Sequence, residues 1–178
     1  MTNGKQPENF INGQGRAAYA NIPYGRSTVG KAGCEAIACY NAMMLLGRPV
    51  PFEEVKAFFE RLFKRGLGWG FGGILGATPI EIRMFLKSRG VSFTRICSVR
   101  AFKKKDAAGE LPPGILIVSY WNKPIFKYGF HTVAIDCRGP KLLVYNRYNN
   151  STSPDPITDL SQLMEGDRRF ISSFYIKL

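Results

Sequence analysis

Histidine is the scarcest reactive residue in this chain, with His131 as the single copy in 178 residues. The four cysteines, Cys34, Cys39, Cys97 and Cys137, are too few and too widely spaced for a disulfide framework. The closest pair has four residues between its members, so the close spacing typical of a cysteine zinc site is missing. We therefore expect no metal site and no cofactor.

Long apolar runs are also missing. The densest, at 42–46 and 115–118, are far too short to cross a bilayer. The first 15 residues contain one lysine and no apolar core region, so they do not form a secretion signal. These features predict a protein with no membrane span that stays in the cytoplasm or is exported without a conventional signal peptide.

Acidic residues are few, because 13 Asp and Glu stand against 25 Lys and Arg and give a formal net charge of +12. This balance excludes a strongly acidic binder and allows an anionic partner. No RNA-binding or DNA-binding motif accompanies the basic residues, so the sequence does not favour nucleic acid as the partner. An acidic partner or an immunity protein is compatible with the charge.

The composition is otherwise that of a globular protein. Hydrophobic residues make up 45% of the chain, which is enough for an ordinary core, and no stretch resembles a linker. We expect a single domain over 1–178. Within it we expect an irregular N-terminal arm at 1–33, a helical half at 34–90 and a sheet half at 91–178.

Three helices are predicted in the helical half. Residues 34–46 are apolar almost all round and stop at Gly47, which indicates a buried helix. Residues 52–65 carry apolar side chains at helical spacing, and a third helix runs from Thr78-Pro79 to about 88. The glycine-rich segment at 66–76 between them is either a loop beside a peptide-binding site or a plain connection with a buried Trp69.

Five strands are predicted at 91–98, 115–120, 131–137, 141–145 and 169–176, where β-branched and aromatic residues gather. A tight turn at 138–140 predicts that the third and fourth of these strands form an antiparallel hairpin. Helices followed by strands indicate an α+β fold, with the buried helix packed on an antiparallel sheet.

Cys34 is the candidate nucleophile because it begins the buried helix. There the helix dipole favours a thiolate, and free main-chain N–H groups can stabilise an oxyanion. The alternative is that Cys34 is a small core residue. Cys39 lies about 140° further round the helix and is expected in the core, as are Cys97 and Cys137 on their strands.

His131 is the candidate base because imidazole titrates near neutral pH and this residue begins a strand. Across the predicted hairpin, the amide oxygen of Asn146 is placed to accept from the imidazole N–H and orient the ring. Asn149 and Asn150 are competing candidates. The alternatives are a satisfied core or surface histidine and an ordinary turn asparagine.

A cysteine at the start of a buried helix, a histidine at a strand start and an asparagine at the next strand end follow the papain-type order. The segments around Gln14, at 19–25 and at 28–34 resemble the papain-like cysteine peptidase superfamily. They are most similar to stand-alone relatives of the bacteriocin-processing, double-glycine leader peptidases. The likeness continues through 130–135 and 143–146.

The resemblance implies a papain-like fold and a peptide or protein substrate. It assigns Cys34 as nucleophile, His131 as general base and acid, Asn146 as the residue that orients the histidine, and Gln14 as the side-chain oxyanion donor. The family usually has Gly-Cys-Gly-Pro at the nucleophile, whereas this chain has Glu35 after the cysteine, followed by alanine. The charge of Glu35 opposes formation of the Cys34 thiolate. Its side chain also narrows the place where the main chain of a substrate would approach.

Three functions follow as hypotheses. The first is a cysteine peptidase or a related amide hydrolase that uses the Cys34 thiol. The second is a toxin or effector domain of the same fold, delivered to other cells. The third is a non-enzymatic basic module that binds an anionic partner.

Overall fold

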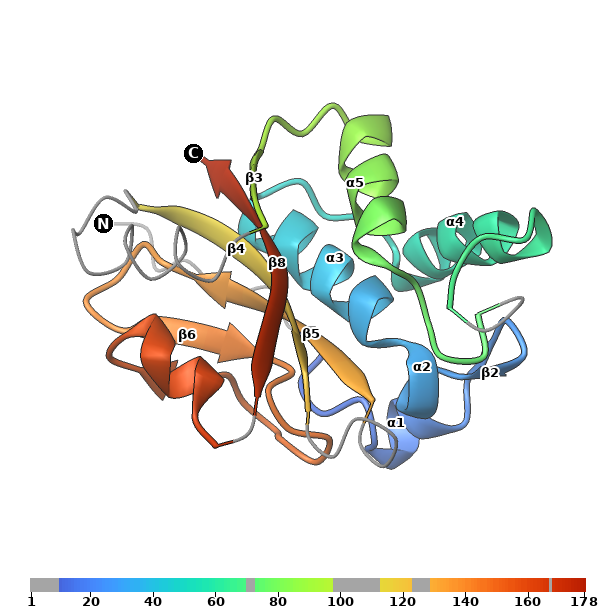
Figure 1. Ribbon diagram of the computed structural model, residues 1–178, viewed down its shortest axis with the longest axis horizontal. Helices are drawn as coiled ribbons and strands as arrows, with labels where there is room; N and C mark the ends of the chain where they lie inside the picture. The colour runs from blue at the N-terminus through green and yellow to red at the C-terminus, as the bar shows by residue number, and fades with distance from the viewer. Residues whose placement is uncertain (1–9, 70–72, 98–112, 123–128, 167) are drawn as a thin grey trace.

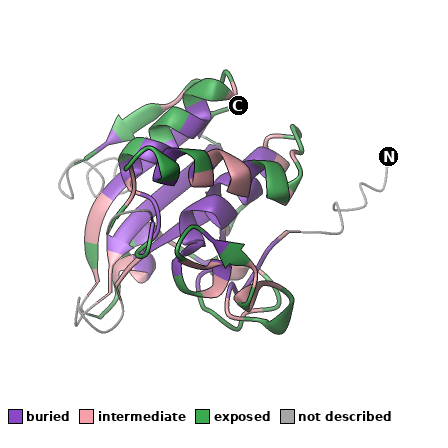
Figure 2. Cartoon of the chain, turned by 90° about the vertical axis from the view of Figure 1, so that its right-hand side faces the viewer, coloured by how far each residue is buried: buried purple, intermediate pink, exposed green. Residues whose placement is uncertain are grey.

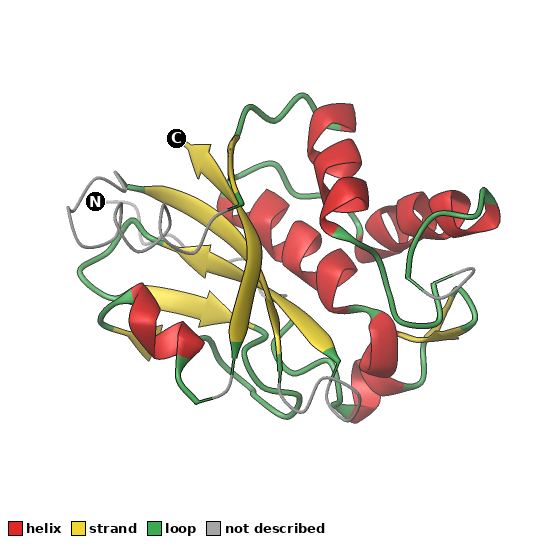
Figure 3. Ribbon diagram, in the orientation of Figure 1, coloured by secondary structure: helices red, strands yellow, loops and turns green. Residues whose placement is uncertain are grey.

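The computed structural model describes residues 10–69, 73–97, 113–122, 129–166 and 168–178. It has a mixed α+β architecture in which helices cover one face of a six-stranded antiparallel sheet (Figure 1; Figure 3). The expected α+β class is confirmed. Residues 70–72 of the predicted glycine-rich segment at 66–76, and the segment at 98–112, lie outside the described residues.

The segment before the first long helix is more ordered than the sequence indicates. It contains α1 (Ala17–Ala20), a two-stranded ribbon of β1 (Pro23–Tyr24) and β2 (Ser27–Thr28), and α2 (Val29–Ala32). The expectation of an irregular arm is therefore wrong for 17–32. These elements are two to four residues long, so none shows the periodicity that predicts helices or strands.

The three predicted helices are confirmed as α3 (Cys34–Leu45), α4 (Phe52–Lys64) and α5 (Pro79–Ser88). Gly47 follows α3 with a φ of +67°, the left-handed conformation that ends a helix. At the start of α5, the side chains of Thr78 and Glu81 form a capping box that satisfies the free N–H groups there.

The sheet consists of β3 (Thr94–Ile96), β4 (Gly114–Trp121), β5 (Phe130–Asp136), β6 (Leu142–Tyr145), β7 (Asp155–Ile157) and β8 (Arg169–Lys177). Their spatial order is β3-β8-β4-β5-β6-β7. The hairpin of β5 and β6 is confirmed, with Ala134 opposite Tyr145. The sequence did not indicate β7, because Pro156 interrupts it, and proline in a sheet is confined to edges such as this one.

The sheet is buried on both faces. Ile117 and Ala134 pack in one core cluster with α3, α4 and α5, whereas Val118 and Val133 belong to a second cluster with the short 3₁₀ helix η1 (Leu160–Met164). Side chains of a strand alternate between its faces, which explains why β4 is apolar at nearly every position. Figure 2 shows the buried residues running through α3 and the central strands.

No helix in the described ranges is both long enough and apolar enough to pass through a membrane.

Candidate active site

Cys34 stands at the junction between the helical layer and the sheet. It begins α3 directly after α2 and Gly33, and it is 4% exposed. Figure 1 shows the beginning of α3 and the beginning of β5 at the same end of the molecule. The N-terminal end of the buried helix is thus brought to the strand that begins near His131.

The edge of β5 at Thr132 lies beside the Cys34 thiol. The N–H of Cys137 donates to Gly114 in β4, so alternate N–H groups of β5, including that of Thr132, point toward the β6 side. The last β6 residue in the ladder is Tyr145, opposite Ala134, so β6 offers no ladder partner at Thr132. The main-chain N–H of Thr132 lowers the pKa of Cys34, so the thiol lies near this edge of β5.

The imidazole of His131 is anchored at the same edge. Its Nε2 lies 2.6 Å from the main-chain oxygen of Asn146, the residue that follows β6. A carbonyl oxygen only accepts, so Nε2 carries the proton in this bond. In the neutral ring Nδ1 is therefore the unprotonated nitrogen with a free electron pair.

The surroundings keep this imidazole uncharged. Burial and the positive charge of Arg168 lower the pKa of His131 to about 4, although the hydrogen bond to Asn146 acts in the opposite direction. Arg168 is held over the ring of Tyr120, which packs at 5.8 Å from the imidazole between ring centroids. At neutral pH His131 is thus a base without a proton on Nδ1. No sequence pattern indicated Arg168 in this role.

Asn146 orients the histidine with a different atom from the one expected. The predicted acceptor is the side-chain amide oxygen, but the structure uses the main-chain oxygen, which corrects that prediction. Asn146 has a φ of +61°, a left-handed conformation that turns its carbonyl toward the ring. Its amide oxygen instead accepts from the N–H of Gln14 at 2.9 Å.

Gln14 and Asn146 form a reciprocal pair. The amide of Asn146 donates to Oε1 of Gln14 at 3.1 Å, and Nε2 of Gln14 donates to the oxygen of Gly30 at 3.1 Å. Gln14 therefore lies beside the segment that leads into Cys34, with its donor group bonded to the main chain. Asn149, an alternative candidate for orienting His131, accepts from the N–H of Gly15 through its main chain.

The thiol of Cys34 is protonated in this environment. Burial raises its pKa well above the ordinary value, and the charge of Glu35 raises it further wherever that carboxyl is ionised; main-chain hydrogen bonding from Thr132 and Glu35 acts in the opposite direction. Combined with the uncharged His131, this gives a neutral thiol and a neutral imidazole rather than a preformed ion pair.

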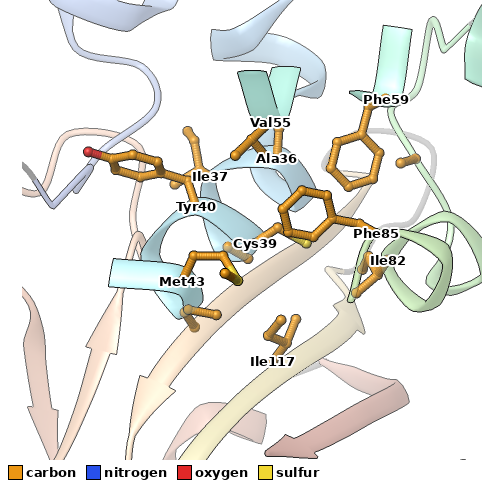
Figure 4. Close-up of a cluster of buried hydrophobic side chains, with 14 of the residues drawn as sticks. Ala36, Ile37, Cys39, Tyr40, Met43, Val55, Phe59, Ile82, Phe85 and Ile117 are labelled. Atoms are coloured by element: carbon orange, nitrogen blue, oxygen red, sulfur yellow. The ribbon is translucent and has the colours of Figure 1, made fainter. Parts of the chain in front are cut away.

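The other cysteines lie apart from this site. Cys39 is fully buried, and Figure 4 shows it among apolar side chains of the core such as Met43 and Phe85, as expected. Cys97 and Cys137 follow the ends of β3 and β5 instead of lying within strands, and Cys97 is exposed. The expectation of a core residue on a strand is therefore wrong for Cys97, whereas Cys137 is half-buried and packs against the second core cluster just beyond the end of β5.

The glycine-rich segment places an aromatic side chain against the sheet. Trp69 is 40% exposed, so the interpretation of a connection with a buried Trp69 is wrong. Its ring packs against Trp121 at 5.7 Å and Phe130 at 6.2 Å between centroids. Phe130 directly precedes His131, so the segment lies close to the candidate base.

Within the described ranges, no group of three His, Cys, Asp or Glu side chains is placed to hold a metal ion. No family model matches the chain. A search of curated proteins likewise found no match.

Proposed function

We propose that this protein is a cysteine-type hydrolase with a papain-like fold that cleaves a peptide or a related amide bond. The proposal is supported by a single constellation that draws on four distant parts of the sequence. Cys34 contacts the main chain of Thr132, His131 is bonded to Asn146, and Asn146 is bonded to Gln14.

One observation carries the proposal, namely the hydrogen bond of His131 Nε2 to the main-chain oxygen of Asn146 at 2.6 Å. It fixes the tautomer in which Nδ1 is the base, at the edge of β5 where the neighbouring residue Thr132 contacts Cys34. A histidine held in this way is what a thiol nucleophile requires for activation.

In the proposed reaction, the Cys34 sulfur attacks the carbonyl carbon of the substrate while its proton passes to Nδ1 of His131. The protonated imidazole then donates this proton to the leaving amine, and the C–N bond breaks to leave a thioester on Cys34. Water then attacks the thioester, with His131 again as the base. This attack breaks the C–S bond and releases the acid product and the Cys34 thiol. The proton transfer accompanies attack, because both groups are neutral beforehand.

The oxyanion that forms on attack is stabilised in this proposal by the main-chain N–H at the start of α3. Gln14 supplies the second donor only if its Nε2 turns away from the oxygen of Gly30, to which it is bonded. Asn146 fixes the other end of that amide and so limits its rotation.

The proposal is tested by peptide cleavage. The wild-type protein is incubated with denatured casein and with a quenched-fluorescence peptide library, and the products are identified by mass spectrometry. We expect cleavage that Cys34→Ala abolishes and that His131→Ala lowers by about 10²-fold or more, since a positioned general base contributes about that factor.

Cys39→Ala is the matched control, because it removes a thiol from the same helix but from the apolar core. It is expected to retain cleavage. Cleavage that survives Cys34→Ala, or the absence of any cleavage by the folded wild-type protein, would contradict the proposal.

A further inference from the structure

Glu35 is a buried acid that the proposed reaction does not use. It directly follows Cys34 in α3, and none of its surface is exposed. Among the described residues, neither carboxyl oxygen has a hydrogen-bond partner. Carboxylates are almost never fully buried unless they are paired, so this side chain requires an explanation.

Gly76, at the end of the glycine-rich segment, lies against the carboxyl group of Glu35. Gly76 has a φ of +90°, and a Cβ atom at this position would lie 2.8 Å from Oε1 and 2.9 Å from Oε2 of Glu35. The segment is held in place by Glu81, whose oxygens accept from the N–H groups of Gly68 at 3.0 Å and Thr78 at 2.6 Å. The main chain thus packs directly on the acid and separates it from solvent.

The surroundings of Glu35 disfavour a negative charge. In the part of the chain that the structure describes, its titratable neighbours are Cys34 and Cys39 in α3, Tyr24 in β1 and Glu81 in α5, and none of these is a cation. Burial and the charge of Glu81 raise the pKa of Glu35 to about 8. The main-chain N–H groups of Glu35 and Ala77 and the Cys34 thiol act in the opposite direction and lower this pKa. The carboxyl is therefore mainly protonated at neutral pH and ionises in mildly alkaline solution.

We propose that Glu35 is a proton-operated brake on Cys34, released when its carboxyl group is protonated and applied when the group ionises. With the carboxyl neutral, no charge next to the sulfur opposes transfer of its proton to His131. With the carboxyl ionised, the negative charge beside the sulfur opposes the loss of the thiol proton. Glu35 is thus a positioning residue that acts through Cys34, and the inference rests on the proposed function.

The test is the pH dependence of Cys34 alkylation by iodoacetamide from pH 6 to 9.5, followed by mass spectrometry of the Cys34 peptide. Cys97→Ser is the background for all variants, because that thiol is exposed. Glu35→Gln removes the buried charge with little change of shape. Glu53→Gln is the matched control, because it makes the same substitution at a side chain that is 70% exposed on α4.

We expect Glu35→Gln and the background protein to react at similar rates at pH 6, and Glu35→Gln to react about tenfold faster at pH 9.5, the factor that one unit of thiol pKa produces. The Glu53→Gln profile should follow the background throughout. A ratio between Glu35→Gln and background that stays constant across the pH range would overturn the proposal.

The background protein alone gives a second readout that does not depend on the folding of Glu35→Gln. Its rate should rise less steeply above about pH 8, where the carboxyl ionises. A uniform rise through that region counts against the brake. If Cys34 instead reacts no faster than Cys39 and His131→Ala changes nothing, the proposed function has failed. If Cys34 depends on His131 but not on Glu35, only the brake has failed.

Discussion

At the scale of single residues, the candidate site is defined by burial that keeps its groups uncharged. Burial raises the pKa of Cys34 and lowers that of His131, so the proton resides on the sulfur in the resting protein. A thiol in this state reacts only when a base takes the proton during attack. The hydrogen bond from His131 to Asn146 therefore matters because it leaves Nδ1 unprotonated, not because it creates an ion pair.

His131 also makes the stability of the fold depend on pH. Its pKa is about 4 in the folded protein and 6.5 in an unfolded chain, so its contribution is fully present above pH 6.5 and is lost as the pH falls to about 4. Between pH 7 and 4, wild type should lose about 3 kcal/mol of unfolding free energy relative to His131→Gln, which cannot titrate. Urea unfolding of both proteins at matched pH measures this difference.

The comparison with His131→Gln is needed because Glu35 titrates in the opposite sense over an overlapping range. Its pKa is raised from 4.5 to about 8, so its contribution is present below pH 4.5 and is lost as the pH rises to about 8. The two effects partly cancel in the wild-type protein. A difference between the two proteins that stays the same from pH 7 to 4 would show that His131 is not buried in its neutral form.

For single residues, the sequence predicts which residues form the site better than it predicts which of their atoms make the contacts. Cys34 and His131 could be selected from a helix start and a strand start. The acceptor on Asn146 was predicted wrongly, because the φ of +61° that turns its carbonyl to the ring has no sequence pattern beyond asparagine itself. The contacts of Thr132 and Arg168 arise from pairing and packing across the sheet, which one sequence does not display.

At the scale of elements, the connection between α4 and α5 packs closely against the start of α3 through Gly76. Gly76 packs against the oxygen of Ala32 and the carboxyl of Glu35, and its N–H and oxygen are bonded within the segment. Because any Cβ atom there would meet those oxygens at less than 3 Å, the close approach of the segment requires glycine. This contact couples the glycine-rich segment to the residue beside the candidate nucleophile.

A pair of glycine substitutions tests this coupling. Gly66→Ala and Gly76→Ala both place alanine at a positive φ, of +82° and +90°, but a Cβ at Gly66 would meet no atom of the described residues within 4 Å. We expect Gly66→Ala to lower the unfolding free energy by about 1 kcal/mol through backbone strain alone. Gly76→Ala should lower it by about 2 kcal/mol more, through the clash with Ala32 and Glu35. Equal losses in denaturant unfolding would show that the segment does not pack on α3 in this way.

The helices and strands were predicted where helix-ending or turn residues agree with the hydrophobic periodicity. Gly47 marks the end of α3, and the Thr78-Pro79 pair marks the start of α5. The turn at 138–140 predicted the hairpin of β5 and β6. The ribbon of β1 and β2 and the edge strand β7 were missed, because each strand is only two or three residues long. Such strands form through contacts with residues far away in the sequence, so the local pattern does not reveal them.

At the scale of the whole molecule, the N-terminal segment joins the two layers. The main chain of Ile11 exchanges two hydrogen bonds with the buried side chain of Asn41 in α3. Asn12 and Gln14 are bonded to Asn146 at the end of β6. The first described residues thus connect the helix that begins with Cys34 to the turn that orients His131, and the geometry of the site depends on the fold as a unit.

The central claim is that Cys34 and His131 act as one nucleophile and base, and the most direct measurement is the alkylation rate of each cysteine in the native protein. Iodoacetamide is applied at pH 7.5 to a Cys97→Ser protein with and without His131→Ala, and each cysteine-containing peptide is quantified by mass spectrometry. The account predicts that Cys34 reacts at least about tenfold faster than Cys39, since thiols near a base are selectively reactive, and that His131→Ala removes most of this advantage. Equal, slow labelling of Cys34 and Cys39 that is unaffected by His131→Ala would contradict it.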